Sequence, residues 1–343
     1  MATAFVIDSR FAAHTMERHP EYAARLTMIR ATLEQHGLLE RFTTINAEPV
    51  SEEFLHIVHD ADYLRLLEKT SRMASPSMLG LDTYITPQSY EIARLAVGGV
   101  LQVVDAVLTG ETDNGLAAIR PPGHHATPSM GMGFCLLNNI ALAARHAQQV
   151  HNIERVLIVD YDVHHGNGTQ DIFYDDPTVL YISTHQSPLY PGTGAIQETG
   201  KGAGKGFTIN AALPPGVGDQ GYAQVFAEIV LPAARQFEPE VILVSGGYDA
   251  HWADPLANMM LSLSGYTHLD RTLLALAHEL CEGRIVFILE GGYNLQVLGN
   301  AWANVAHVLL GDTEIDDVLG PADRSEPSIA QPLNKLKQIH NLT

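Results

Sequence analysis

Short apolar runs rich in β-branched residues alternate along the chain with longer stretches in which apolar residues recur at helical spacing. The runs that match buried strands are residues 4–7, 115–119, 155–159, 179–183, 207–210, 241–245 and 284–289. The stretches that match helices include residues 23–35, 88–108, 139–150, 222–236 and 266–281. This alternation predicts an α/β fold, namely a single-domain three-layer αβα arrangement whose mostly parallel central sheet is covered by helices on both faces.

One domain accounts for most of the chain, because no repeat, low-complexity tract or flexible linker interrupts the alternation. We expect this domain to span residues 1–320. The periodicity is lost from about Pro321, which predicts a C-terminal tail or arm over residues 321–343. The long glycine-rich segment 186–206 lies between two predicted strands, a position that favours a functional loop over a domain boundary.

Composition and charge narrow the class of protein. Hydrophobic residues make up 46% of the chain and charged residues 17%, which predicts a folded core. The formal net charge of −19 predicts no nucleic-acid partner and no binding to anionic membranes, and it is compatible with a cationic substrate. Two cysteines, Cys135 and Cys281, exclude a disulfide framework and a four-cysteine zinc module. Because we find no signal peptide and no membrane-spanning segment, we expect a cytoplasmic protein.

Polar residues crowd the ends of four of the predicted strands. They occupy residues 120–125, 160–168, 246–251 and 290–294. The carboxyl ends of parallel strands lie along one edge of a sheet, and ligands of open α/β folds bind outside that edge. We therefore expect these four segments to converge on one site.

Two carboxylates and an imidazole in these segments form a candidate metal site. Asp162 and His164 are two residues apart at a strand end, so both side chains can point the same way. An Asp-x-His pair by itself is more often a solvated turn or a helix cap, but Asp249 arrives from a separate strand end. Three N/O ligands with an open position suit catalytic Zn2+, and also Fe2+ or Co2+.

The His124–His125 pair follows Pro-Pro-Gly at another strand end. Two buried imidazoles need two sets of hydrogen-bond partners, so core packing explains the pair poorly. Either ring can act as a general base near neutral pH, and Asp160 is the carboxylate expected to raise the pKa of its neighbour. A metal-bound water as nucleophile with a histidine beside it as general base is typical of a hydrolase.

Three aromatic residues in glycine-containing loops each have two interpretations. Tyr293 follows Gly291 and Gly292, and it is either a capping surface aromatic or a hydroxyl donor to a developing oxyanion. Phe134 and Tyr190 are either packed loop residues or the walls of an apolar channel.

Taken together, these motifs resemble the zinc-dependent histone deacetylase and acetylpolyamine amidohydrolase family of the arginase–deacetylase superfamily. The matching stretches are residues 120–126, 131–135, 138–139, 160–171, 191–194, 246–250 and 290–293. They follow the family's order between about residue 8 and residue 310. Asn167 and the Glu-Gly-Gly-Tyr loop are more similar to the class II branch and its bacterial relatives than to class I.

The resemblance implies the composition of a metal centre and a proton carrier. Asp162, His164 and Asp249 would bind Zn2+, with Fe2+ as the alternative ion. His125 would act first as general base and then as general acid. It would pair with Asn167, where other branches have a second aspartate, so its basicity would be lower here.

The resemblance also implies the remaining catalytic and substrate contacts. His124 would pair with Asp160 and assist electrostatically, and Tyr293 would donate to the carbonyl oxygen of the substrate. The residues that would line the acyl-amine tunnel or its rim are Gly133, Phe134, Tyr190, Leu256 and Asp82.

Members of this family bind monovalent cations, and the resemblance therefore implies K+ as a second cofactor. The residues of one site would be Asp160, Asp162, His164, Ser183 and Thr184. The residues of a second site, contributing mainly backbone carbonyls, would be Phe173, Asp176, Val179 and Phe207.

The implied reaction is hydrolysis of an N-acetyl amide, with residues 1–320 as the deacetylase catalytic domain. Acetyl-lysine in proteins or peptides is the predicted substrate. Acetylated polyamines or other small acylamines are the alternative, which the apolar Leu256 at the rim slightly disfavours. Two further alternatives, an inactive binding module and a two-manganese ureohydrolase, are opposed by the complete set of catalytic motifs. Relatives range from monomers to tetramers, so a homo-oligomer stays open.

Overall fold

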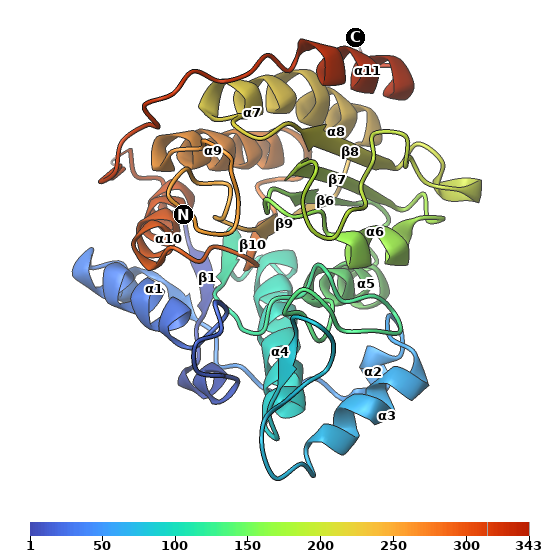
Figure 1. Ribbon diagram of the computed structural model, residues 1–343, viewed down its shortest axis with the longest axis vertical. Helices are drawn as coiled ribbons and strands as arrows, with labels where there is room; N and C mark the ends of the chain where they lie inside the picture. The colour runs from blue at the N-terminus through green and yellow to red at the C-terminus, as the bar shows by residue number, and fades with distance from the viewer. Residues whose placement is uncertain (314, 343) are drawn as a thin grey trace.

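A parallel sheet forms the centre of the computed structural model, which describes residues 1–313 and 315–342 (Figure 1). The strands are β1 (Thr3–Val6), β2 (Thr43–Thr44), β3 (Ser77–Met78), β4 (Tyr84–Ile85), β5 (Asn114–Ala117), β6 (Val156–Asp160), β7 (Val179–Gln186), β8 (Thr208–Leu213), β9 (Val241–Gly246) and β10 (Ile285–Leu289). The eight-stranded sheet has the order β2-β1-β5-β10-β9-β6-β7-β8, and each neighbouring pair in it is parallel. β3 and β4 form a separate antiparallel pair.

Helices cover both faces of this sheet. They are α1 (Ala24–Gln35), α2 (Glu52–Leu55), α3 (Ala61–Thr70), α4 (Ser89–Leu108), α5 (Asn139–His151), α6 (Asn167–Phe173), α7 (Asp219–Val225), α8 (Leu231–Phe237), α9 (Leu263–Leu280), α10 (Leu295–Leu310) and α11 (Ala330–His340). Short 3-10 turns occur at η1 (Ser9–Ala13), η2 (Leu39–Arg41) and η3 (Gly202–Gly204), and a π-helical turn, η4 (Phe226–Val230), joins α7 to α8. On one face α4 packs on β1, β5 and β10 while α5 packs on β6 and β9; on the other, α10 packs on β5 between α1 and α9 (Figure 1).

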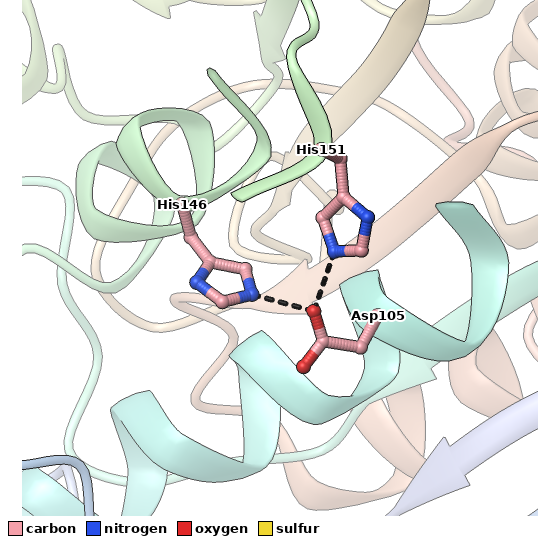
Figure 2. Close-up of side chains that lie close together, drawn as sticks. All are labelled: Asp105, His146 and His151. Atoms are coloured by element: carbon pink, nitrogen blue, oxygen red, sulfur yellow. Dashed lines mark hydrogen bonds and ion pairs between the residues drawn. The ribbon is translucent and has the colours of Figure 1, made fainter. Parts of the chain in front are cut away.

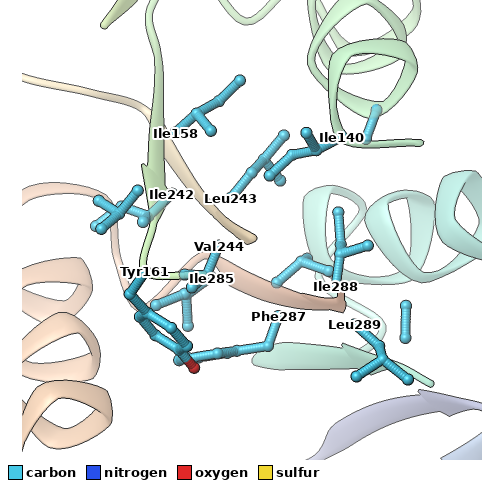
Figure 3. Close-up of a cluster of buried hydrophobic side chains, with 14 of the residues drawn as sticks. Ile140, Ile158, Tyr161, Ile242, Leu243, Val244, Ile285, Phe287, Ile288 and Leu289 are labelled. Carbon is cyan, nitrogen blue, oxygen red and sulfur yellow. The ribbon is translucent and has the colours of Figure 1, made fainter. Parts of the chain in front are cut away.

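The central strands are buried along their whole length. Ile158 of β6, Leu243 of β9 and Ile288 of β10 lie in one cluster with Ile140 of α5 (Figure 3). Because helices cover both faces, successive side chains of these strands are apolar up to the carboxyl ends, where Asp160 and Ser245 lie, instead of alternating with polar ones. This burial explains why the strands are visible as short continuous apolar runs in the sequence.

The strand order decides where the functional loops meet. β5, β10, β9 and β6 are consecutive neighbours in the sheet, and they are the strands followed by the polar segments described above. The register places Asp160, at the end of β6, beside Ser245 of β9 on one side and Ser183 of β7 on the other. The predicted convergence at one edge of the sheet is therefore confirmed.

The αβα fold class and the predicted strands and helices are confirmed, and no end differs by more than three residues. Among the described residues the main sheet is wholly parallel, where the sequence predicted a mostly parallel one. None of the helices within residues 1–313 and 315–342 combines the length and apolar character needed to cross a membrane.

The segment after Pro321 contains a helix that the sequence pattern did not predict. α11 packs on β8 and η4 and buries Leu333 and Leu336. Before it, the Glu326 carboxylate accepts hydrogen bonds from three backbone N–H groups at the start of α7, at 2.9 Å each. Two buried leucines are too few to produce a periodic signal, so the helix depends on tertiary packing for its stability.

Candidate active site

Three predicted metal ligands meet at the carboxyl ends of β6 and β9. Nδ1 of His164 lies 3.1 Å from Oδ1 of Asp162 and 3.2 Å from Oδ2 of Asp249. All three residues are buried, and one ligand atom of each lies within 4.8 Å of the other two. Two carboxylates and one imidazole in this arrangement are the donor types that Zn2+ and Fe2+ accept in catalytic sites.

Backbone groups hold the two carboxylates without using every oxygen. The N–H of Gly291 donates to Oδ2 of Asp162 at 2.7 Å, and the N–H of Val163 donates to Oδ1 of Asp249 at 2.9 Å. Oδ2 of Asp249 is buried without a hydrogen-bond partner in the described part of the chain. An unpaired buried carboxylate oxygen is costly. This oxygen faces His164 and is free to bind a cation, so the residues fit a metal.

Two glycines make room for these carboxylates. A Cβ atom at Gly247 would lie 2.1 Å from Oδ2 of Asp162, and one at Gly291 would lie 2.1 Å from Oδ2 of Asp249. No side chain fits at such distances. The Gly-Gly motifs that follow β9 and β10 are therefore required by the close approach of backbone to the ligand set.

The two adjacent histidines have different partners. Nδ1 of His124 lies 3.0 Å from Oδ2 of Asp160, and Nδ1 of His125 lies 2.8 Å from Oδ1 of Asn167. Both predicted pairs are present, with the imidazole centroids 4.0 Å apart. Asp160 also accepts a hydrogen bond from the Tyr181 hydroxyl at 3.0 Å, which orients the carboxylate toward His124.

The surroundings shift the pKa values of His124 and His125 in opposite directions. Burial alone would lower the pKa of His124, but the charges of Asp160 and other nearby carboxylates raise it to about 10. Burial and the positive charge of His124 hold the pKa of His125 well below its usual range. One ring therefore favours the charged form and the other the neutral form, which is the form that can accept a proton.

Glu290 supports the histidine loop, a role that the sequence analysis did not assign to it. Its Oε2 accepts hydrogen bonds from the N–H groups of Gly123 at 2.7 Å and His124 at 3.1 Å, and Ser245 donates to Oε1 at 3.2 Å. Burial raises the pKa of Glu290 to about 7. The only sequence signal for this role was the position of a glutamate directly after a buried strand.

Tyr293 lines the same pocket as His164, and Arg25 packs against its ring. The guanidinium carbon of Arg25 lies 5.1 Å from the centre of the Tyr293 ring, and Arg25 Nε donates to the carbonyl of Gly292 at 2.8 Å. Burial raises the pKa of the Tyr293 hydroxyl well above its usual value, so the hydroxyl remains a hydrogen-bond donor. No sequence pattern pointed to Arg25, which lies in α1, far along the chain from every motif.

A pocket of about 180 Å³ leads to this centre. Its lining residues are Asp82, His125, Gly133, Phe134, His164, Leu189, Tyr190, Leu256 and Tyr293. The structure thus brings all five predicted tunnel and rim residues to one pocket with His125 and Tyr293. Leu189 is an additional wall that the sequence analysis did not name.

Gly133 and Tyr190 form the wall beside His125. A Cβ atom at Gly133 would lie 2.2 Å from the His125 ring, and Gly133 has a φ of +55°, so only glycine fits there. The Tyr190 ring meets His125 edge-on, with 5.1 Å between centroids. Asp82 accepts a hydrogen bond from the Gly133 N–H at 3.2 Å. Tight packing of this kind leaves a narrow passage for an extended chain.

The residues of the two predicted monovalent-cation sites lie at opposite ends of β7. Ser183 is paired in register with Asp160 near the metal ligands, and the Thr184 hydroxyl donates to the Asp160 carbonyl at 3.4 Å. At the other end, Arg145 donates to Asp176 Oδ2 at 2.6 Å and stacks over Phe173. An arginine charge already neutralises the only carboxylate of the second group.

The chain is similar to several known proteins. Residues 19–309 match the model of the histone deacetylase domain. Histone deacetylase 14, chloroplastic, of Arabidopsis thaliana is 42% identical over 96% of this chain and 82% of its own length. Polyamine deacetylase HDAC10 of Mus musculus is 43% identical over 85% of this chain and 45% of its own length. The crystal structure of the HDA15 HD domain superposes with a TM-score of 0.91 and 38% identity, covering 99% of this chain and 96% of that one.

Proposed function

The chain belongs to the histone deacetylase family, and from that premise we propose that it hydrolyses N-acyl amides at a Zn2+ centre formed by Asp162, His164 and Asp249. The resemblance seen in the sequence, the fold class and the assignment as a deacetylase are confirmed. The observation that carries the zinc proposal is the meeting of this ligand set with His125 and Tyr293 at the end of one narrow pocket.

The proposed chemistry divides between the metal and the side chains around it. When bound, Zn2+ supplies a Lewis acid that polarises the amide carbonyl and lowers the pKa of water. The neutral His125 takes the proton of the attacking water at Nε2, because its Nδ1 is already paired with Asn167, and then returns that proton to the leaving amine. Tyr293 would donate a hydrogen bond from its hydroxyl to the carbonyl oxygen as negative charge develops there.

His124 and Asp160 would act through position and charge. A charged His124 beside His125 disfavours early protonation of the base and leaves the proton mobile at the moment of amine departure. Asp160 orients the His124 ring and stabilises its positive charge, in the way that a carboxylate orients a histidine behind many hydrolytic centres.

We propose acetyl-lysine in proteins or peptides as the substrate and acetylated polyamines as the second candidate. The apolar Leu256 at the rim favours a lysine side chain, whose remaining length is uncharged methylene, and Asp82 is placed to hold a substrate backbone N–H. The net charge of −19 and the similarity to a polyamine deacetylase favour the second candidate. The side chain of acetyl-lysine carries no charge, whereas N-acetylputrescine and N-acetylcadaverine carry one ammonium group and acetylspermidine carries two.

Monovalent cations are a second expected type of ligand. We propose K+ at the group around Asp160 and Ser183, where the Asp160 and Asp162 carboxylates lie beside the carbonyl of Asp160 and the Thr184 hydroxyl. We keep the second group as a weaker site, because Arg145 is hydrogen-bonded to the Asp176 carboxylate. Fe2+ is the alternative to Zn2+ at the catalytic ligands. A cytoplasmic location and an oligomeric state remain predictions.

One comparison of substrates tests the proposal. The protein is dialysed against a chelator, reloaded with Zn2+ or Fe2+, and assayed on an acetyl-lysine peptide, N-acetylputrescine, N-acetylcadaverine and acetylspermidine. We expect chelation to abolish activity and metal to restore it, and Tyr293→Phe to lower kcat by about 10²–10³-fold, the usual loss for one oxyanion donor. Full activity after complete metal removal contradicts the proposal.

A further inference from the structure

A second group of potential metal ligands lies outside the catalytic centre. Asp105 of α4 and His146 and His151 of α5 point toward one another (Figure 2). Nε2 of His146 lies 2.5 Å and Nε2 of His151 lies 2.6 Å from the same oxygen, Oδ1 of Asp105. These three residues, which we call the α4–α5 triad, have no role in the proposed reaction.

The α4–α5 triad lies at the edge of the sheet opposite the catalytic centre. In a parallel α/β fold each helix runs back from the carboxyl end of one strand to the amino end of the next. Asp105 is near the C-terminal end of α4, which leads into β5, and His151 is the last residue of α5, which leads into β6. A ligand at this triad therefore cannot reach the catalytic pocket.

The two imidazoles are mostly covered, whereas the carboxylate is accessible. Phe54 meets the His146 ring edge-on at 5.7 Å. The side chains of His146 and His151 are 11% and 15% exposed, whereas that of Asp105 is 42% exposed. A groove of about 450 Å³ lies beside Asp105, with Gln102 also in its lining. The groove leaves the Asp105 carboxylate open to water on that side.

We propose that the α4–α5 triad binds a second divalent transition-metal ion, with Zn2+ as the favoured ion. Two imidazoles and one carboxylate, with the remaining positions open to water, are a donor set that Zn2+ accepts. Metal–ligand bonds of about 2.0–2.1 Å place tetrahedral ligand atoms roughly 3.3 Å apart, so the ion requires Asp105 to withdraw by under about 1 Å. The exposed carboxylate can make that movement while the buried rings stay fixed.

The arrangement of donor atoms also favours a cation there. Both imidazole Nε2 atoms face the same oxygen, Oδ1 of Asp105. The ion would connect α4 to α5 and stabilise the helix layer behind the catalytic loops, since α5 begins at Asn139, directly after the loop that contains Gly133.

Zinc stoichiometry tests this proposal. Wild-type protein, Asp105→Asn and His151→Gln are equilibrated by dialysis at one buffered free Zn2+ concentration, and bound zinc is counted by elemental analysis. We expect the wild type to bind one more equivalent than either variant. We also expect the last equivalent to raise Tm by about 3 °C in the wild type, a shift that both variants lose.

Matched controls separate this site from other zinc-binding features. His268→Gln removes an exposed imidazole from α9, on the other face of the sheet, and should keep the wild-type stoichiometry. Deacetylase activity should be unchanged in all these variants, which verifies folding. A failure of the proposed catalytic zinc would lower every count equally and leave the difference between wild type and variants intact. Equal zinc counts and equal Tm responses in wild type and both triad variants would overturn the proposal.

Discussion

The Asp254 carboxylate holds the backbone of Tyr293. Its Oδ2 accepts hydrogen bonds from the N–H groups of Tyr293 at 2.7 Å and Asn294 at 3.1 Å, while Oδ1 accepts from the N–H of Leu256 at 3.0 Å. One buried side chain therefore ties the loop that presents the hydroxyl to the loop that forms the rim of the pocket. The position of Tyr293, the proposed catalytic tyrosine, depends on a residue that does not line the pocket.

We predict that Asp254→Asn lowers kcat/KM by about 10–100-fold, since a small misplacement of a catalytic group has effects of this size. Both oxygens of Asp254 accept hydrogen bonds from backbone N–H groups. Asparagine keeps one acceptor oxygen and replaces the other with an NH2 donor, so the N–H groups of one loop would lose their acceptor. Steady-state kinetics measure the loss. If Asp254 acts through Tyr293, its substitution should cost much less in a Tyr293→Phe background. Additive losses in the double variant would instead mean that Asp254 serves general stability.

We predict that Asn167→Asp moves the acidic limb of the kcat/KM profile to higher pH. The amide oxygen of Asn167 lies 2.8 Å from Nδ1 of His125 and carries no charge. A carboxylate at that place favours the imidazolium and should raise the pKa of His125. Activity at low pH should therefore fall more than activity at high pH. The test is a pH–rate profile of kcat/KM on one substrate. An acidic limb at the same pH in both proteins would contradict the assignment of His125 as general base.

We predict that Leu256→Glu shifts preference toward acetylated polyamines. Leu256 lies at the rim of the pocket, where a carboxylate would meet the second ammonium group of a polyamine. The ratio of kcat/KM for acetylspermidine over the acetyl-lysine peptide should rise about 10-fold, and the gain should shrink at high salt because exposed charges are screened. Leu256→Gln, similar in size but uncharged, is the control. An equal shift in both variants would assign the effect to shape rather than charge.

We predict that Asp270→Asn stabilises the protein increasingly as pH rises. Asp270 is buried on α9, where Tyr161 donates to Oδ1 at 3.0 Å and Oδ2 has no partner among the described residues. Burial raises the pKa of Asp270 to about 8. The native state then holds a proton that the unfolded state releases near pH 4, so ionisation lowers the free energy of unfolding between those two pH values.

Urea unfolding at several pH values tests the sign and size of this effect. The gain of Asp270→Asn over wild type should grow by about 1–3 kcal/mol from pH 5 to pH 8, against a limit of about 1.4 kcal/mol per pH unit for one group. Asp323→Asn, at an exposed position, is the matched control and should show no such trend. A constant difference across this range would mean that Asp270 titrates in the same way in both states.

Much of the fold could be predicted because its pattern is local. The strands β6, β9 and β10 are buried on both faces, so each appears in the sequence as a continuous apolar run followed by polar residues. Elements stabilised mainly by distant contacts were not predicted. α11 depends on packing against β8, and Glu326 caps the start of α7 across more than a hundred residues of chain.

In the candidate site too, residues close to strand ends were predictable from the sequence, and residues that act across the fold were not. The ligands and the adjacent histidines lie within a few residues of strand ends, where spacing and residue type indicated their chemistry. Arg25, Asp254 and Glu290 support the site through backbone contacts made across the fold, and a single charged residue in a helix or loop has no spacing that distinguishes it from a solvated one.

The sequence by itself therefore determined the class of fold, the edge of the sheet at which the chemistry gathers and the identity of the residues that would perform it. It could do so because buried strands and strand-end motifs depend on neighbours along the chain. Only the tertiary structure decided which carboxylate oxygen is left unpaired, which imidazole is charged and what holds Tyr293 in place. It also brought Asp105 together with His146 and His151. These properties depend on distances and burial between segments far apart in the chain, and no local pattern of residues encodes them.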